Sequence, residues 1–180
     1  MSGVDLKGAT YHLSSIPVRN AGMVIAQSFY KPLFERLGLL TDGDFNSEAD
    51  RQKAISLLQY MVTGQQTSNE SHLLLNKVLC GYPINESVET TIEIEESDIE
   101  MIESLIKTMI YHWTAIGNSS IEGFRGNWLV RDGTLTEEDD HWNLAVEKRA
   151  YDVLLNKAPF GFSTIKLPWM DKPLYVTWNY

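Results

Sequence analysis

Apolar residues recur at helical spacing through most of the first two thirds of the chain. The stretch "NAGMVIAQSFYKPLFERLGLL" predicts a helix over residues 20–37. Its apolar members lie about one helical turn apart: Val24, Ile25, Phe29, Leu33, Phe34 and Leu37. Pro32 lacks a backbone N–H, so we expect it to kink this helix or to begin a second segment. Gly38 and the polar run "TDGDFNS" then end the pattern.

Two further helices are bounded by residues typical of helix ends. Ser47 followed by Asp50 indicates a helix N-terminus, and Gly64 is typical of the position after a helix. We therefore expect a helix between them. The stretch "ESHLLLNKVLCG" predicts a short apolar helix that ends at Gly81, with Pro83 two residues further on.

The strongest helical pattern follows an acidic connection, "YPINESVETTIEIEES", which we expect to be exposed. Ser97 and Glu100 form a capping-box signal. After them one apolar stripe runs through Ile99, Ile102, Leu105, Ile106, Met109, Ile110 and Trp113. Glu103 and Lys107 should pair on the outward face, because residues four apart are neighbours on a helix.

Another predicted helix begins at a second capping signal, Ser119 with Glu122, and runs to Asp132. The apolar period then changes. Trp142, Leu144 and Val146 alternate, as in a half-buried strand. "YDVLLNKAP" suits a short helix, and residues 162–167 and 174–178 predict two strands joined by the turn "PWMDKP".

These elements predict an α+β fold, a bundle of about five helices followed by a small antiparallel C-terminal sheet. We expect residues 1–17 to be a flexible lead-in and residues 18–180 to form a single globular domain. At 180 residues the chain is long enough to bury a core.

The C-terminal stretch "LPWMDKPLYVTW" predicts a strand-turn-strand closure of the sheet. Leu174, Val176 and Trp178 should fill the core, and the two prolines should fix the turn. Trp169 and Met170 lie at the turn. They either face a partner protein, since Trp and Met are enriched at interfaces, or pack inward, and the sequence leaves both alternatives open.

The composition is that of an ordinary globular protein, with 43% hydrophobic and 22% charged residues. A net charge of -9 argues against binding nucleic acid or an anionic membrane. No apolar run approaches the roughly 20 residues of a membrane span, and the N-terminus lacks a signal-peptide pattern. A single cysteine, Cys80, excludes an intramolecular disulfide and fits synthesis in a reducing cytosol.

Candidate chemistry is sparse. The four histidines have no metal-ligand spacing, and His112 suits a helix flank. Cys80 ends an apolar helix and reads as a buried, inert thiol. The acidic run at residues 137–140 is typical of a solvated turn, and the glycines form no phosphate-binding loop. The chain therefore predicts no catalytic, cofactor-binding or metal-binding residue, and we do not expect an enzyme.

Two arginines, Arg125 and Arg131, flank Trp128. This arrangement would suit stacking on a nucleic acid base, but the acidic balance favours a structural pairing of the arginines with nearby acids. The remaining tryptophans lie among aliphatic residues and suit core or interface roles.

Several segments together carry a resemblance. They are "NAGMVIAQSFYKPLFERLGLL", "AISLLQYMVTG", "LLLNKVLCG", "HWTAIGNSSIEGFRGNWLVRDGTL", "WNLAVEKRAYDVLLNKAPFGFSTIKLPWM" and "LYVTW". In this order they resemble the conserved region of the tape measure proteins of bacterial contractile injection systems, which are phage-tail-like particles with a sheath, an inner tube and a baseplate. The resemblance covers about residues 18–178. Phe160 in "APFG" departs from the Trp-containing segment that the family pattern suggests, but keeps an aromatic side chain.

The resemblance implies a structural protein that sets the length of the tube and is held at the baseplate hub. It implies tube, hub or baseplate proteins as partners and brings no catalytic residues. The alternative is an adaptor or chaperone that docks an effector or caps the tube. The candidate partner-binding residues are Trp169, Met170, Trp128 and Arg131, and self-association stays open. We expect the protein to be cytoplasmic and then incorporated into the particle.

The length of the chain bears on this role. As one continuous helix, 180 residues would reach about 270 Å. A compact domain of this size has a radius of gyration of only about 16 Å. We therefore expect an anchoring or assembly module, as the globular part of a longer ruler or as a short relative.

Overall fold

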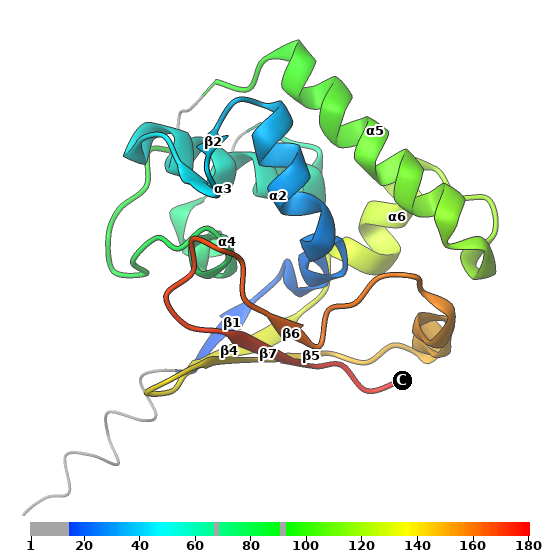
Figure 1. Ribbon diagram of the computed structural model, residues 1–180. Helices are drawn as coiled ribbons and strands as arrows, with labels where there is room; N and C mark the ends of the chain where they lie inside the picture. The colour runs from blue at the N-terminus through cyan, green and yellow to red at the C-terminus, as the bar shows by residue number, and fades with distance from the viewer. Residues whose placement is uncertain (1–14, 67–68, 91–92) are drawn as a thin grey trace, which may run out of the picture.

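The computed structural model describes residues 15–66, 69–90 and 93–180, and shows a sheet with helices on one side of it (Figure 1). The α+β class is therefore confirmed. Residues 1–14, most of the predicted lead-in, lie outside the described residues. Ser15–Val18, which includes the last residues assigned to that lead-in, forms strand β1.

The helical elements are short except for α3 and α5. In chain order they are η1 (Ala21–Ala26), α2 (Gln27–Arg36), α3 (Glu48–Thr63), η2 (Glu70–His72), α4 (Leu74–Leu79), α5 (Glu96–His112), η3 (Thr114–Ile116), α6 (Ile121–Phe124), the π-helical turn η4 (Arg125–Leu129) and η5 (Ala150–Lys157). The predicted bundle of about five helices is therefore too simple, because several short 3-10 segments and one π turn interrupt the longer helices and the whole set forms a layer over the sheet (Figure 1).

The main sheet has the strand order β1-β4-β5-β7-β6. Its strands are β1 (Ser15–Val18), β4 (Gly133–Glu137), β5 (Trp142–Val146), β6 (Thr164–Ile165) and β7 (Leu174–Thr177). A separate hairpin joins β2 (Leu40–Thr41) and β3 (Asp44–Phe45). The main sheet is antiparallel apart from β5 and β7, which run parallel because the chain crosses over through η5 and β6 between them. The prediction found β5, β6 and β7 and missed β1 and β4.

The boundaries of three predicted helices shift. Residues 21–26 form a 3-10 helix, and α2 begins at Gln27, so the change of helix type does not occur at Pro32, which lies inside α2. The N-cap of α5 is Glu95, which forms a capping box with Asp98, so the predicted signal at Ser97 was wrong. The N-cap of α6 is Ser120, one residue after the predicted cap. The caps of α3, Ser47 and Gly64, are confirmed.

A cluster of buried amides links the first strand to the helical layer. Asn20 donates from Nδ2 to Gln59 Oε1 at 2.9 Å and to Asn76 Oδ1 at 2.8 Å. Asn76 in turn donates to the backbone oxygen of Ile55 at 3.0 Å. The three amide side chains, from the end of β1, from α3 and from α4, are called the amide cluster below. Because a buried polar group is costly unless it is hydrogen-bonded, this cluster fixes how these segments pack.

Candidate interaction surface

The two predicted turn residues pack inward. Trp169 is 6% exposed and Met170 is 4% exposed. The Trp169 ring lies 5.7 Å from that of Phe34 and 5.1 Å from that of Phe45, and its Nε1 donates to the Leu79 backbone oxygen at 2.7 Å. Of the two alternatives for this turn, the structure therefore shows inward packing.

The other two predicted partner-binding residues are also buried. The Trp128 ring lies 4.5 Å from that of Trp113, and Arg131 is fully buried against Asp152. The predicted structural pairing of these arginines with an acid is confirmed for Arg131 but wrong for Arg125, which forms no ion pair among the described residues. None of the four predicted partner-binding side chains is exposed on the surface. Their binding to a partner stays a prediction that would require these side chains to become exposed.

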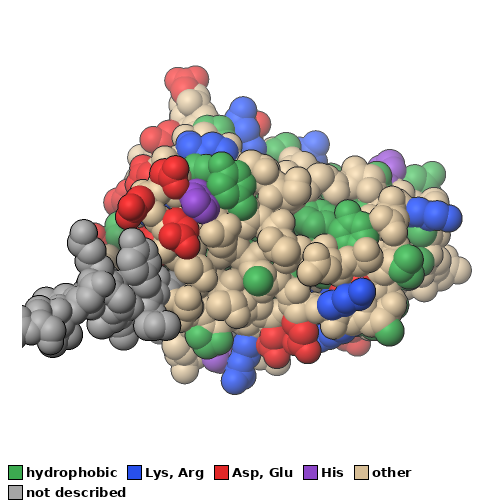
Figure 2. Space-filling model, turned by 90° about the horizontal axis from the view of Figure 1, so that it is seen from below, with side chains coloured by type: hydrophobic (Ala, Val, Ile, Leu, Met, Phe, Trp, Pro, Cys, Tyr) green, Lys and Arg blue, Asp and Glu red, His purple; other side chains and the backbone are tan. Residues whose placement is uncertain are grey.

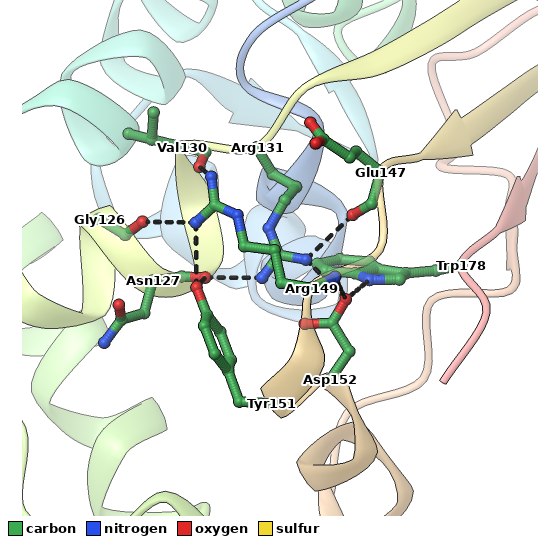
Figure 3. A network of polar contacts seen from close by, with 9 residues as sticks. All are labelled: Gly126, Asn127, Val130, Arg131, Glu147, Arg149, Tyr151, Asp152 and Trp178. Carbon is green, nitrogen blue, oxygen red and sulfur yellow. Dashed lines mark hydrogen bonds and ion pairs between the residues drawn. The ribbon is translucent and has the colours of Figure 1, made fainter.

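Arg131 and Asp152 are the centre of a buried network that we call the C-terminal clasp (Figure 3). Arg131 donates from Nη1 to Asp152 Oδ2 at 2.7 Å and from Nη2 to the backbone oxygen of Asn127 at 2.7 Å. The same carboxylate oxygen accepts from the Arg149 backbone N–H and from Trp178 Nε1, each at 2.9 Å. The Arg131–Asp152 ion pair therefore lies at the centre of hydrogen bonds that join η4, η5 and the residue after β7, Trp178.

Hydrogen bonding controls the charge state of Asp152. Burial alone would raise the pKa of this carboxyl group. The hydrogen bonds from Arg131, Arg149 and Trp178, with the positive charge of Arg131, outweigh burial and hold the pKa below its usual range. Asp152 is therefore ionised at neutral pH, and the clasp holds a charge pair.

The sheet has one covered and one open face. One side-chain row, Ile16, Leu135, Leu144 and Val176, faces the helices. The alternate rows point away from them and are exposed or half-buried: Ser15, Pro17, Thr134, Thr136, Asn143, Ala145, Thr164, Tyr175 and Thr177. We call this set the open sheet face. These strand positions include no charged residue, although the chain has a net charge of -9. At one end of β4 and β5, the charged residues Arg19, Asp132 and Glu147 line a hollow together with Pro17, Thr134 and Ala145.

Acidic residues border the open sheet face at the β4–β5 hairpin. Figure 2, which views the molecule from below, shows many acidic groups toward the left and other acidic and basic groups toward the lower edge of the view. In the hairpin, Asp140 Oδ1 lies 2.5 Å from His141 Nδ1, and the His141 ring lies 5.0 Å from that of Tyr175. The hydrogen bond from His141 lowers the pKa of Asp140. The hairpin is solvated, as predicted, but it also borders a neutral surface.

The two edges of the sheet are poorly suited to pairing with another strand. Strand β1 carries Pro17, which has no backbone N–H, and β6 has only two residues. A partner would therefore contact the face of the sheet more readily than its edges. The open sheet face can be recognised only from the register in which the strands pair. Its only signal in the sequence is the Thr-rich alternation in "GTLTE" and "LYVT".

Cys80 and the possible metal ligands were the candidates for chemistry among the residues that the structure describes. Cys80 is buried, as predicted, and burial raises the pKa of its thiol, so the thiolate is not populated at neutral pH. Within the described ranges, no group of three or more His, Cys, Asp or Glu side chains could hold a metal ion. No helix in these ranges is both long and apolar enough to cross a bilayer.

Comparison with known proteins identifies the family. The family model described as contractile injection system tape measure protein matches residues 7–178, nearly the whole chain. No curated protein and no solved structure matches the chain.

Proposed function

The chain belongs to the contractile injection system tape measure protein family, and we propose that it anchors the ruler at the hub or baseplate end of the tube through its open sheet face. The family is a structural component of an injection particle, and in that role a protein works by contact with other particle proteins. The proposal assigns the contact to one surface.

The observation that carries this proposal is that the outward-facing strand positions of the open sheet face carry no charged side chain, with charged residues only at its borders. Burying a charged side chain in an interface is costly, whereas hydroxyl and small apolar groups lose little on desolvation when they are hydrogen-bonded or packed. A surface that avoids charge in an acidic chain is therefore suited to burial. Tyr175 is 42% exposed on this face and supplies the aromatic type that is enriched in binding sites.

Dimensions favour anchoring over measuring for the described part of the chain. Its buried apolar residues form one core cluster, so it spans only tens of ångströms, with a radius of gyration of about 16 Å. Such a body cannot extend along a long tube. It can hold a longer component in place, and we expect it to be made in the cytoplasm before incorporation.

The test places a charge at the centre of the open sheet face. Thr134 and Ala145 lie opposite each other on β4 and β5, and both are exposed. Two variants, Thr134→Arg and Ala145→Arg, each place a charge at one of these positions. We expect each variant to fold and to lose at least about tenfold of its incorporation into purified particles, because a buried unpaired charge costs more than the 1.4 kcal/mol that a tenfold loss represents. Quantitative mass spectrometry of the particles measures the loss.

The matched control is Thr108→Arg, which adds the same charge on the exposed side of α5. It should be incorporated like the wild type, and circular dichroism should show native folding for all three variants. Normal incorporation of both sheet variants would overturn the proposal. Recovery of the wild type only from assembly intermediates, never from finished particles, would indicate the chaperone role instead.

A further inference from the structure

A cleft on the helical side of the molecule, remote from the open sheet face, is lined by charged side chains that form no ion pair among the described residues. It lies between α5 and α6, which are neighbours in Figure 1. Its cavity measures about 460 Å³, and a second cavity of about 390 Å³ continues along the same flank of α5, sharing Lys107 and Ile110 with the first.

The predicted pairing of Glu103 with Lys107 was wrong. Both residues line the cleft, yet no ion pair joins them, and Lys107 forms none with any other residue that the structure describes. Glu122 lines the same cavity and is equally without an ion pair in the described ranges. Charged side chains that surround one cavity without pairing leave attraction available to a ligand.

Arg125 is the most unusual of these groups. Its side chain is 9% exposed, and it lines the cavity with Lys107. Nε donates to the Met61 backbone oxygen at 2.9 Å, which places the guanidinium at the C-terminal end of α3, 5.4 Å from the Tyr60 ring. Nη2 is buried and has no hydrogen-bond partner among the described residues. A buried arginine normally pairs with a carboxylate, and no ion pair with one is present here.

We propose that this cleft binds a carboxylate side chain of a partner protein, with Arg125 and Lys107 as the cationic groups. The planar guanidinium suits a carboxylate because two of its N–H groups can bond both oxygens. Ser119 and Ser120 lie in the same lining: Ser119 Oγ already donates to the Ser120 backbone oxygen at 2.9 Å, whereas Ser120 Oγ accepts from the Gly123 N–H and keeps its own hydrogen to donate to an anion.

The other residues of the cleft define the rest of the ligand. Ile110 and Ile121 are half-buried in the lining and offer an apolar wall to the carbon chain that carries the carboxylate. Glu103 and Glu122 line the same cavity and disfavour a highly charged anion, since like charges repel. The site therefore fits an acidic side chain on a protein segment better than a small, highly charged anion. This inference does not depend on the open sheet face.

The test uses propionate, a carboxylate with a short apolar chain, and its uncharged analogue propionamide. Each is titrated into the wild-type protein at constant ionic strength, and backbone amide shifts are followed by nuclear magnetic resonance. We expect propionate to produce saturable shifts at residues 119–122 and propionamide to produce none. Lys107→Gln should weaken propionate binding about tenfold, as expected for the loss of a hydrogen bond to a charged group.

Controls separate the site from general effects. Lys107 is exposed, so its variant should fold normally, whereas Arg125→Gln also removes a contact to α3 and could unfold the protein. Lys157→Gln removes an exposed lysine elsewhere and should leave binding unchanged. Equal shifts with propionamide, or propionate binding that is insensitive to Lys107→Gln, would overturn the proposal. Binding of inorganic phosphate without binding of propionate would do the same.

Discussion

The two buried polar clusters of this protein solve the same problem with different chemistry. The amide cluster joins Asn20 to Asn76 across 56 positions of sequence using neutral groups. The C-terminal clasp joins Asp152 to Arg131 and to Trp178 using an ion pair. Both fasten segments that are distant in sequence, and both leave a buried oxygen without a hydrogen-bond partner, Asn20 Oδ1 in one and Asp152 Oδ1 in the other.

The difference lies in what happens when one member is lost. When a buried amide loses its partner, a neutral polar group is left in the interior without a hydrogen bond. When an ion pair loses one member, a full charge is left there without a counter-ion. The helical layer should therefore tolerate damage to its cluster better than the sheet tolerates damage to the clasp. The same contrast makes only the clasp sensitive to pH, because amides do not titrate.

The largest expected effect comes from Asp152→Asn. The change keeps the size of the side chain and removes its charge, so the fully buried Arg131 loses its counter-ion. We expect the free energy of unfolding to fall by about 3–5 kcal/mol, as for other broken buried ion pairs. Urea denaturation followed by tryptophan fluorescence measures the fall.

A double variant tests whether unpaired charge is the cause. Replacing both members, with Arg131→Met and Asp152→Leu together, removes the charges and keeps the site filled. It should recover part of the stability lost by Asp152→Asn, since apolar replacements of buried pairs are often close to neutral. If the free energy of unfolding of Asp152→Asn lay within about 1 kcal/mol of that of the wild type, the role given to the clasp would be contradicted.

A smaller effect is expected from Asn76→Leu in the amide cluster. Leucine has a similar volume but leaves the Asn20 amide with fewer partners, because Asn76 Oδ1 no longer accepts from it. Gln59 Oε1 still accepts from Asn20 at 2.9 Å, so the loss is partial. We expect a fall of about 1–3 kcal/mol in the same urea experiment. A fall equal to or larger than that of Asp152→Asn would break the comparison between the two clusters.

Local patterns predicted some of these elements and could not predict others. Trp142, Leu144 and Val146 alternate and were identified as a strand, now β5. Strand β4 has a single buried side chain, Leu135, and β1 carries a proline, so neither shows the repeated buried apolar positions that identified β5. Their pairing with each other links residues more than 110 positions apart, which no short window of sequence contains.

The direction in which a side chain points also could not be predicted from the local sequence. The position of Trp169 in a turn is compatible with exposure or burial, and its contacts with Phe34 and Phe45 decide between them. The open sheet face escaped prediction for the same reason, because it exists only once five strands are in register. What the sequence did indicate correctly was Arg131 pairing with an acid, although nothing in it singled out Asp152.

The smallest expected effect is a change with pH in the difference in unfolding free energy between the wild type and Asp152→Asn. The pKa of Asp152 is lowered on folding, so its stabilising effect is complete above the unfolded value of about 3.9 and is lost as the pH falls through the lower folded value. The difference in unfolding free energy between the two proteins should thus stay constant from neutral pH down to about pH 5 and narrow below about pH 4. Urea denaturation at a series of pH values gives this difference directly. The difference in unfolding free energy between wild type and Asn76→Leu should not change over the same range, because no titrating group is removed. If the difference between wild type and Asp152→Asn instead widened on acidification, Asp152 would not be held as a carboxylate.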